Sequence, residues 1–119
     1  MNSINRPFIS IILPCYNEEA ILEMNVVQII KYLDSKNEKY KWEIIIINDG
    51  SRDKTGEIAD NFENQNSNIR VIHHPTNLNL GNALKTGFKN AKGSIIVIMD
   101  VDLSYSVEHI EKMVDKMIE

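Results

Sequence analysis

The sequence has a single cysteine and no long apolar run, and both absences narrow the class of protein. Cys15 has no partner within the chain, so an internal disulfide or a cysteine-rich metal site is excluded. The longest apolar stretches, around 44–47 and 95–99, are far shorter than the ~20 residues that cross a bilayer. No charged segment followed by an apolar one opens the chain, so no signal peptide is predicted. We therefore expect a protein of a reducing compartment, the cytoplasm.

An excess of positive charge is also missing. The chain carries 13 Lys and Arg against 17 Asp and Glu, which gives a formal charge of -4. A nucleic-acid-binding domain would normally present a basic surface, so we predict no nucleic-acid partner. What is present is enough apolar material for a core, because 43% of the 119 residues are hydrophobic. This amount is typical of a single folded domain that spans residues 1–119.

The apolar residues follow two rhythms that alternate along the chain. Short β-branched runs predict buried strands, and apolar residues spaced three and four apart predict helices. The expected strands are 8–13, 43–47, 69–73 and 94–99. The expected helices are 18–36, 55–65 (capped by Ser51 or Asp53), 80–91, and a last one that contains 110–118. This order is the signature of a three-layer α/β/α fold with a mainly parallel, Rossmann-like sheet.

Ligands of such sheets bind beyond the carboxyl ends of the strands, so the segments that follow each strand are the informative ones. The turn after the first strand has no glycine, which excludes the G-x-G-x-x-G motif, and the chain has no P-loop. Carboxylates stand there instead of glycines. A nucleoside diphosphate could bind beside them only with a cation between, for which Mg²⁺ or Mn²⁺ is suited.

Asp100 and Asp102 directly follow the fourth strand and flank a single residue. Repulsion between two such carboxylates needs a compensating charge. We therefore predict that they hold one divalent ion, directly or through water, with positions left open for phosphate oxygens. The alternative is that one aspartate caps the last helix and the other is solvated.

Three further residues at this edge of the sheet have two interpretations each. Asp49 either accepts hydrogen bonds from a nucleobase or is a turn residue before Gly50. Tyr16 either stacks on a base or packs at the rim of the sheet. Glu18 either binds a hydroxyl group or lies, with Glu19, in the first turn of a helix. The residues alone do not decide between these interpretations.

No function is predicted for the histidines or for Cys15. His73 and His74 are adjacent in a strand, so their rings point to opposite faces and do not share a metal ion. His109 falls on the side of the last helix that we expect to be exposed. Cys15 has no nucleophile-activating neighbour in the sequence and is expected to be a small buried residue.

Taken together, these segments resemble one family. Pro14-Cys15-Tyr16-Asn17-Glu18 is similar to the P-x-Y-N-E opening of family 2 glycosyltransferases with the GT-A fold. Residues 47–55 resemble their V-D-D-G-S-x-D-x-T segment, and 79–87 their N-x-G-x-x-x-A-x-x-x-G helix with the alanine shifted. The stretch 100–104 resembles the D-A-D-L-S element of dolichyl- or polyprenyl-phosphate mannose and glucose synthases.

The resemblance implies roles for particular residues. Those that match nucleoside-holding positions, with Asp49 reading the base edge, are Pro14, Tyr16, Glu18, Ile47 and Asp49. Those that match the segment meeting ribose, diphosphate and metal are Met99, Asp100, Val101 and Asp102. Asp100 and Asp102 are thereby the implied catalytic and metal-binding residues. Asn48 replaces the commoner first aspartate of the family, and Val101 replaces its alanine.

The resemblance also implies an activity. It is the metal-dependent, inverting transfer of a hexose from GDP-mannose or a UDP-sugar to an acceptor such as a polyprenyl or dolichyl phosphate. The enzyme would then work at the cytoplasmic face of a membrane. Family members continue into an acceptor-binding half, so we expect this chain to be the N-terminal nucleotide-sugar-binding half, truncated before that point and inactive by itself.

Other interpretations stay open. The edge of strand 94–99 would be uncovered in such a fragment, so a homo-oligomer is one expectation. A non-catalytic nucleotide-binding or interaction module could have the same fold. A receiver-like signalling domain is disfavoured, because it needs its acidic pair after the first strand, where this chain has Pro14, Cys15 and Tyr16.

Overall fold

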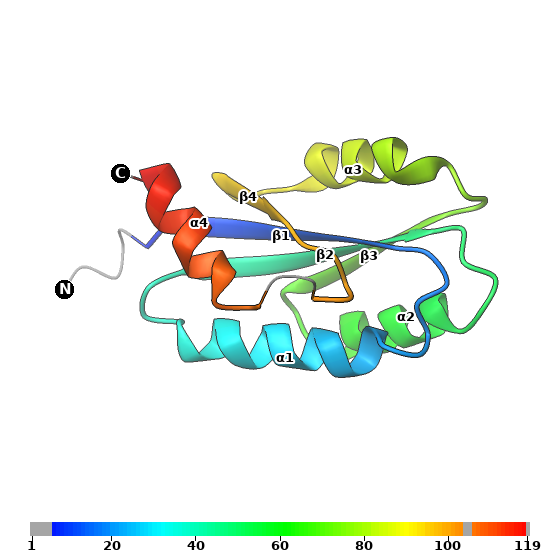
Figure 1. Cartoon of the computed structure of the whole chain (residues 1–119), viewed down its shortest axis with the longest axis horizontal. Coiled ribbons are helices and arrows are strands. Elements are labelled where there is room, and N and C mark those ends of the chain that lie inside the picture. Colours follow the sequence, from blue (N-terminus) through cyan, green and yellow to red (C-terminus); the bar gives the residue numbers. More distant parts are fainter. Residues whose placement is uncertain (1–5, 104–105, 119) are drawn as a thin grey trace.

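The computed structural model describes residues 6–103 and 106–118 and confirms the alternation of strands and helices (Figure 1). The strands are β1 (Phe8–Cys15), β2 (Lys41–Asp49), β3 (Ile69–His74) and β4 (Ile95–Ile98). The helices are α1 (Leu22–Ser35), α2 (Thr55–Gln65), α3 (Asn79–Asn90) and α4 (His109–Ile118). Among these residues, no helix is long and apolar enough to cross a membrane.

The strands form one parallel sheet in the order β3-β2-β1-β4. The chain adds β2 and β3 on one side of β1 and then places β4 on the other side. The order therefore reverses between β1 and β4, and in open α/β sheets this switch point is where ligands bind. Within residues 6–103 and 106–118, β4 is an edge strand of the sheet, as expected, and its Ile98 is exposed.

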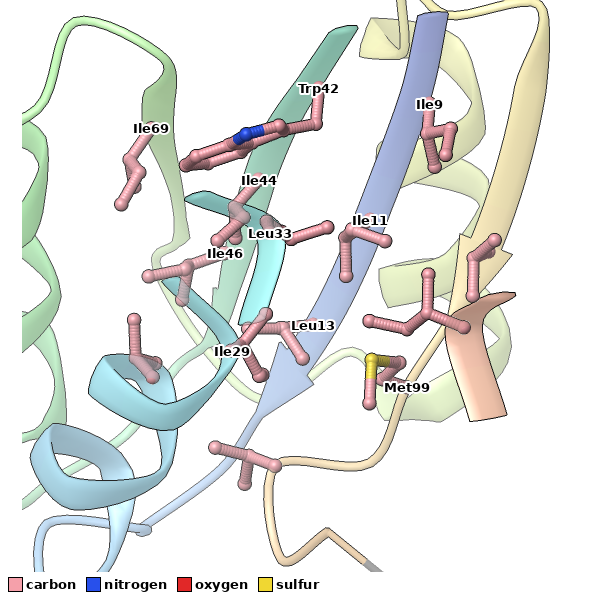
Figure 2. Close-up of a cluster of buried hydrophobic side chains, with 14 of the residues drawn as sticks. Ile9, Ile11, Leu13, Ile29, Leu33, Trp42, Ile44, Ile46, Ile69 and Met99 are labelled. Atoms are coloured by element: carbon pink, nitrogen blue, oxygen red, sulfur yellow. The ribbon is translucent and has the colours of Figure 1, made fainter. Parts of the chain in front are cut away.

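The sheet is buried on both faces, as the continuous apolar runs predict. One face carries Ile9, Ile11 and Leu13 of β1 and is covered by α1, α2 and α4 (Figures 1 and 2). The other face carries Ile12 and is covered by α3. Alternate residues of a strand point to opposite faces, so a strand buried on both sides must be apolar at successive positions.

Helix α1 begins at Leu22, and the prediction of a start at Glu18 was wrong. Residues 18–21 form a separate turn, in which the Glu18 carbonyl accepts hydrogen bonds from the N–H groups of Ile21 (3.2 Å) and Leu22 (2.9 Å). The Glu18 N–H is taken by Thr55 Oγ1 at 2.8 Å. The helix begins only after this turn because the Ile21 backbone, at φ -124° and ψ -13°, is not helical.

Candidate functional site

The loops after β1, β2 and β3 lie at the same end of the sheet (Figure 1). The first two are joined by hydrogen bonds from backbone N–H groups to side chains. Asn17, at a positive φ of 53°, donates its N–H to Ser51 Oγ (2.9 Å), and its Oδ1 accepts the Arg52 N–H (2.9 Å). The Asp53 carboxylate accepts the Thr55 N–H (2.9 Å), but the N-cap position of α2 is Lys54, so the prediction of Ser51 or Asp53 as the cap was wrong.

Gly50 brings the second loop against the third. Its φ of +75° is in the left-handed region, and a Cβ placed there would lie 2.2 Å from the carbonyl carbon of Thr76. Only glycine allows both the backbone conformation and this approach. The three loops are therefore packed into one surface by the chain itself.

A cavity of about 260 Å³ opens where these loops meet the beginning of α3. It is lined by Pro14, Cys15, Tyr16, Asp49, Asn77, Asn79, Leu80 and Ala83. The Tyr16 side chain is 44% exposed, so an aromatic surface is available at the rim. A concave, mostly apolar space with a few polar groups is the usual form of a small-molecule site.

Asp49 is the charged residue of this cavity, and it is only 4% exposed. One of its oxygens, Oδ1, accepts the Leu78 N–H (2.9 Å) and lies 2.8 Å from His74 Nδ1. The other nitrogen of His74, Nε2, lies 2.8 Å from Thr86 Oγ1 on α3. Asp49 is thus both a turn residue before Gly50 and a fixed carboxylate facing a cavity.

Cys15 lines the cavity, but its thiol is unreactive. It is buried, and burial together with the negative charge of Glu18 raises the pKa of its thiol to about 12. A thiol in this state is neutral at physiological pH and is a poor nucleophile. The expectation of a buried, structural cysteine is confirmed.

The acidic segment after β4 has a different character. The Leu103 N–H donates to the Asp100 carbonyl (3.0 Å), which closes a tight turn with Val101 and Asp102 at its centre. Val101 is buried, and its carbonyl accepts a hydrogen bond from Asn25 Nδ2 of α1 (2.7 Å). Asp100 and Asp102 are both exposed.

The two aspartates face different neighbours. Asp100 borders a small cavity with His109 and Met113 of α4. His109 is half-buried there, so its expected exposed position was wrong. Asp102 lies near Glu18: burial raises the pKa of Glu18, and the negative charges of Asp102 and Asp53 raise it further.

This chemistry fits a divalent cation that completes its coordination with phosphate oxygens. In residues 6–103 and 106–118, no group of three or more His, Cys, Asp or Glu side chains is placed to hold a metal. Mg²⁺ in particular is often held by one or two carboxylates and the phosphates of the substrate rather than by a protein cage. Repulsion between Glu18 and Asp102 is what a bound cation would relieve.

The structure sorts the remaining predicted residues into separate groups. Pro14, Tyr16 and Asp49 share the cavity. Ile47 is fully buried beneath α3, and Met99 and Val101 are buried on the other face, so their side chains belong to the core. Among the residues that the structure describes, Glu18, Asp100 and Asp102 do not line the Asp49 cavity.

Sequence reasoning missed His74. The β2–β3 register pairs it with Asp49, and the last residues of two neighbouring parallel strands therefore meet at this edge. Counting this register from the two apolar runs could have placed the imidazole beside the carboxylate. We considered His74 only as a partner of His73.

Comparison with known families identifies the class of protein that this fold and site define. The model of the family described as "Glycosyl transferase family 2" matches residues 10–119. The chain therefore belongs to glycosyl transferase family 2, as the four motifs indicated.

A curated relative narrows the resemblance. The chain is 35% identical, over 107 residues, to a dolichyl-phosphate beta-glucosyltransferase of Trichomonas vaginalis. The match covers 87% of this chain and 33% of the relative. The chain thus spans about a third of the length of that enzyme.

Solved structures confirm the GT-A architecture. A mannosyltransferase from Pyrobaculum calidifontis, in complex with GDP-Man and Mn²⁺, superposes with a TM-score of 0.71 at 22% identity, over 85% of this chain and 29% of that one. Glucosyl-3-phosphoglycerate synthase from Mycobacterium tuberculosis, in complex with Mn²⁺, UDP and glucosyl-3-phosphoglycerate, gives 0.62 at 28% identity. The second match covers 83% of this chain and 35% of that one.

Proposed function

We propose that this chain is the donor-binding part of an inverting, metal-dependent glycosyltransferase. The reaction is the transfer of a hexose from a nucleoside diphosphate sugar to a polyprenyl or dolichyl phosphate. The observation that carries the proposal is the fixed carboxylate of Asp49, which shares one cavity with the exposed ring of Tyr16 in a family 2 chain. The dolichyl-phosphate glucosyltransferase relative supports the acceptor class.

The cavity is the place for the nucleoside. A base between Tyr16 and the start of α3 gains apolar contact on its ring faces, and aromatic rings favour offset stacking on such surfaces. Asp49 then accepts a hydrogen bond from a ring N–H of the base. Because the carboxylate is already held by Leu78 and His74, little conformational freedom is lost when the base binds.

The acidic turn is the place for the diphosphate. Asp100 and Asp102 follow β4 at the switch point, where they would hold Mg²⁺ or Mn²⁺ against the phosphates. When bound, such a cation neutralises the charge that develops on the departing nucleoside diphosphate. The Mn²⁺ in the two solved structures supports this assignment. Asn25 and the buried Val101 side chain hold the turn against α1 and the core.

The acceptor needs little activation. A lipid phosphate is already anionic, so it can attack the anomeric carbon from the face opposite the diphosphate without a general base. The enzyme's task is then to place the two reactants in line. A lipid acceptor would also bring the complete protein to the cytoplasmic surface of a membrane.

Titration calorimetry with nucleoside diphosphates in Mn²⁺ tests the proposal. We expect measurable binding of UDP or GDP, and no comparable binding of adenosine or cytidine diphosphate. Absence of heat with every nucleotide would contradict the proposal and favour a non-catalytic interaction module.

A further inference from the structure

We propose that His74 is a positioning residue that leaves Asp49 a single oxygen for the nucleobase, and that the site therefore selects uracil over guanine. This inference rests on the proposed function, because it assumes that the Asp49 cavity receives a base. It goes further because it chooses between a uridine and a guanosine diphosphate sugar as the donor. The choice follows from which oxygen of the Asp49 carboxylate already accepts hydrogen bonds.

The two oxygens of Asp49 have different surroundings. Oδ1 accepts the Leu78 N–H at 2.9 Å and lies 2.8 Å from His74 Nδ1. A carboxylate can only accept, so Nδ1 carries the hydrogen and donates it. A carboxylate has about four lone-pair sites on two oxygens, so two donors fill Oδ1. Within the part of the chain that the structure describes, Oδ2 has no recorded hydrogen bond.

His74 is held rigidly enough to maintain this difference. Its side chain is 9% exposed, and its second nitrogen lies 2.8 Å from Thr86 Oγ1. The Thr86 hydroxyl is itself bonded to the Asn82 carbonyl of α3 (3.0 Å). The imidazole is thus fixed at both nitrogens between β2 and α3, and it cannot turn away from Asp49 without breaking two contacts.

The bases differ in what they offer to one oxygen. Guanine presents two adjacent donors, N1–H and the exocyclic amino group, which together suit both oxygens of a carboxylate. Uracil presents one donor, N3–H, between two carbonyl groups. Adenine and cytosine place a lone pair at the corresponding ring nitrogen, which a carboxylate repels. A carboxylate with one open oxygen is therefore matched by uracil.

Base analogues test this on the unmodified protein. Calorimetry in Mn²⁺ should show UDP binding at least about tenfold more tightly than GDP, the scale expected when a donor is buried without an acceptor. UDP methylated at N3 should lose at least about the same factor. Inosine diphosphate lacks the exocyclic amino group of GDP and should bind more tightly than GDP, because no donor is then left without an acceptor. Tighter binding of GDP than of both UDP and inosine diphosphate would overturn the inference.

Variants test the part played by His74. His74→Phe keeps a ring but donates no hydrogen bond, so Oδ1 is released and the UDP-to-GDP affinity ratio should fall about tenfold towards one. His74→Asn, whose amide can donate in place of Nδ1, should restore much of the ratio. A ratio that His74→Phe leaves unchanged would contradict the positioning role.

Two more variants separate positioning from folding. Thr86→Val removes the contact at Nε2, together with the hydroxyl's bond to the Asn82 carbonyl, and should lower the ratio in the same direction. His73→Phe is the matched control: the two nitrogens of this ring lie 2.8 Å from Asp60 Oδ1 and 2.9 Å from Asn48 Nδ2, and neither contacts the Asp49 carboxylate, so the ratio should not change. A change with His73→Phe equal to that with His74→Phe would contradict the inference.

The test also separates this inference from the proposed function. If no nucleoside diphosphate binds, the donor-binding function itself fails. If GDP binds more tightly than UDP, the donor-binding function stands and only the choice of base by Asp49 and His74 fails.

Discussion

The Asp49 cavity and the acidic turn lie at the same edge of the sheet, but they are built differently. Around the cavity, side chains of one loop accept hydrogen bonds from backbone N–H groups of a neighbouring loop. Ser51 accepts from Asn17, Thr55 from Glu18, and Asp49 from Leu78. The acidic turn, residues 100–103, has an internal hydrogen bond and one recorded bond to α1, through Asn25. Its two carboxylates are exposed, whereas Asp49 is buried.

This difference indicates which contacts of the site are formed by the protein itself and which need a ligand. A carboxylate that reads a base must have a fixed direction, and Asp49 is held by the Leu78 N–H and by His74. The carboxylates that we propose for the metal are exposed, and the negative charge of Asp102 adds to burial in raising the pKa of Glu18. We infer that the cavity is preorganised and that the acidic turn is completed by cation and diphosphate.

The largest effect should come from breaking the contact between loops at the cavity. Gly50→Ala forces an L residue into a positive φ, which costs about 1–3 kcal/mol, and places its Cβ 2.2 Å from the Thr76 carbonyl carbon. We expect a loss of stability of about 3 kcal/mol or more, because the clash adds to the strain. Urea unfolding measures it as a shift in the midpoint.

Gly81→Ala is the matched control for that change. A Cβ at Gly81 meets nothing within 4 Å, and the residue lies in α3. We expect a gain in stability of up to about 1 kcal/mol, because alanine is the better helix former. Equal losses from both substitutions would show that the approach of Gly50 to Thr76 does not matter.

A smaller effect, on binding and not on stability, should follow from changing the acidic turn. Asp102→Asn removes a charge that we assign to the metal. In Mn²⁺ the affinity for UDP should fall at least about tenfold, which corresponds to about 1.4 kcal/mol. The melting temperature should stay the same or rise, because repulsion with Glu18 is removed. Asp34→Asn, at an exposed position of α1, should change neither quantity.

The smallest effect concerns Glu18 and depends on pH. Burial, then Asp102 and Asp53, raise the pKa of Glu18, so ionising it opposes folding. This penalty is present above the folded-state pKa and disappears below the unfolded one. Glu18→Gln should therefore stabilise the chain at pH 7 by at most about 1 kcal/mol, and the gain should vanish as the pH falls below about 4. A gain that grows on acidification would contradict this.

The sequence predicted the fold well because the signal is local. Successive apolar residues in β1 and β2 can only be buried on both faces of a sheet, and helices at 3.6-residue spacing must cover those faces. The start of α1 was misplaced because the Ile21 backbone is not helical (φ -124°) and the turn that begins at Glu18 is tied to Thr55 of the next loop. Such contacts leave no mark in a local pattern.

The site was predicted less completely. Tyr16 and Asp49 could be expected at one edge because both follow parallel strands, and the structure puts them in one cavity. The contact between His74 and Asp49 depends on the register of β2 and β3 and on the contact of His74 with Thr86 of α3. The burial of Ile47 depends on α3 packing over β2, which the motif alone does not reveal.

The most direct test compares uridine with UDP, each titrated calorimetrically with and without Mn²⁺. We expect uridine to bind weakly, with an affinity that Mn²⁺ leaves unchanged, because uridine occupies only the cavity beside Asp49. UDP should bind at least about tenfold more tightly with Mn²⁺ than without it. Equal affinity of UDP in the two conditions would contradict the assignment of Asp100 and Asp102 to a cation that receives the diphosphate.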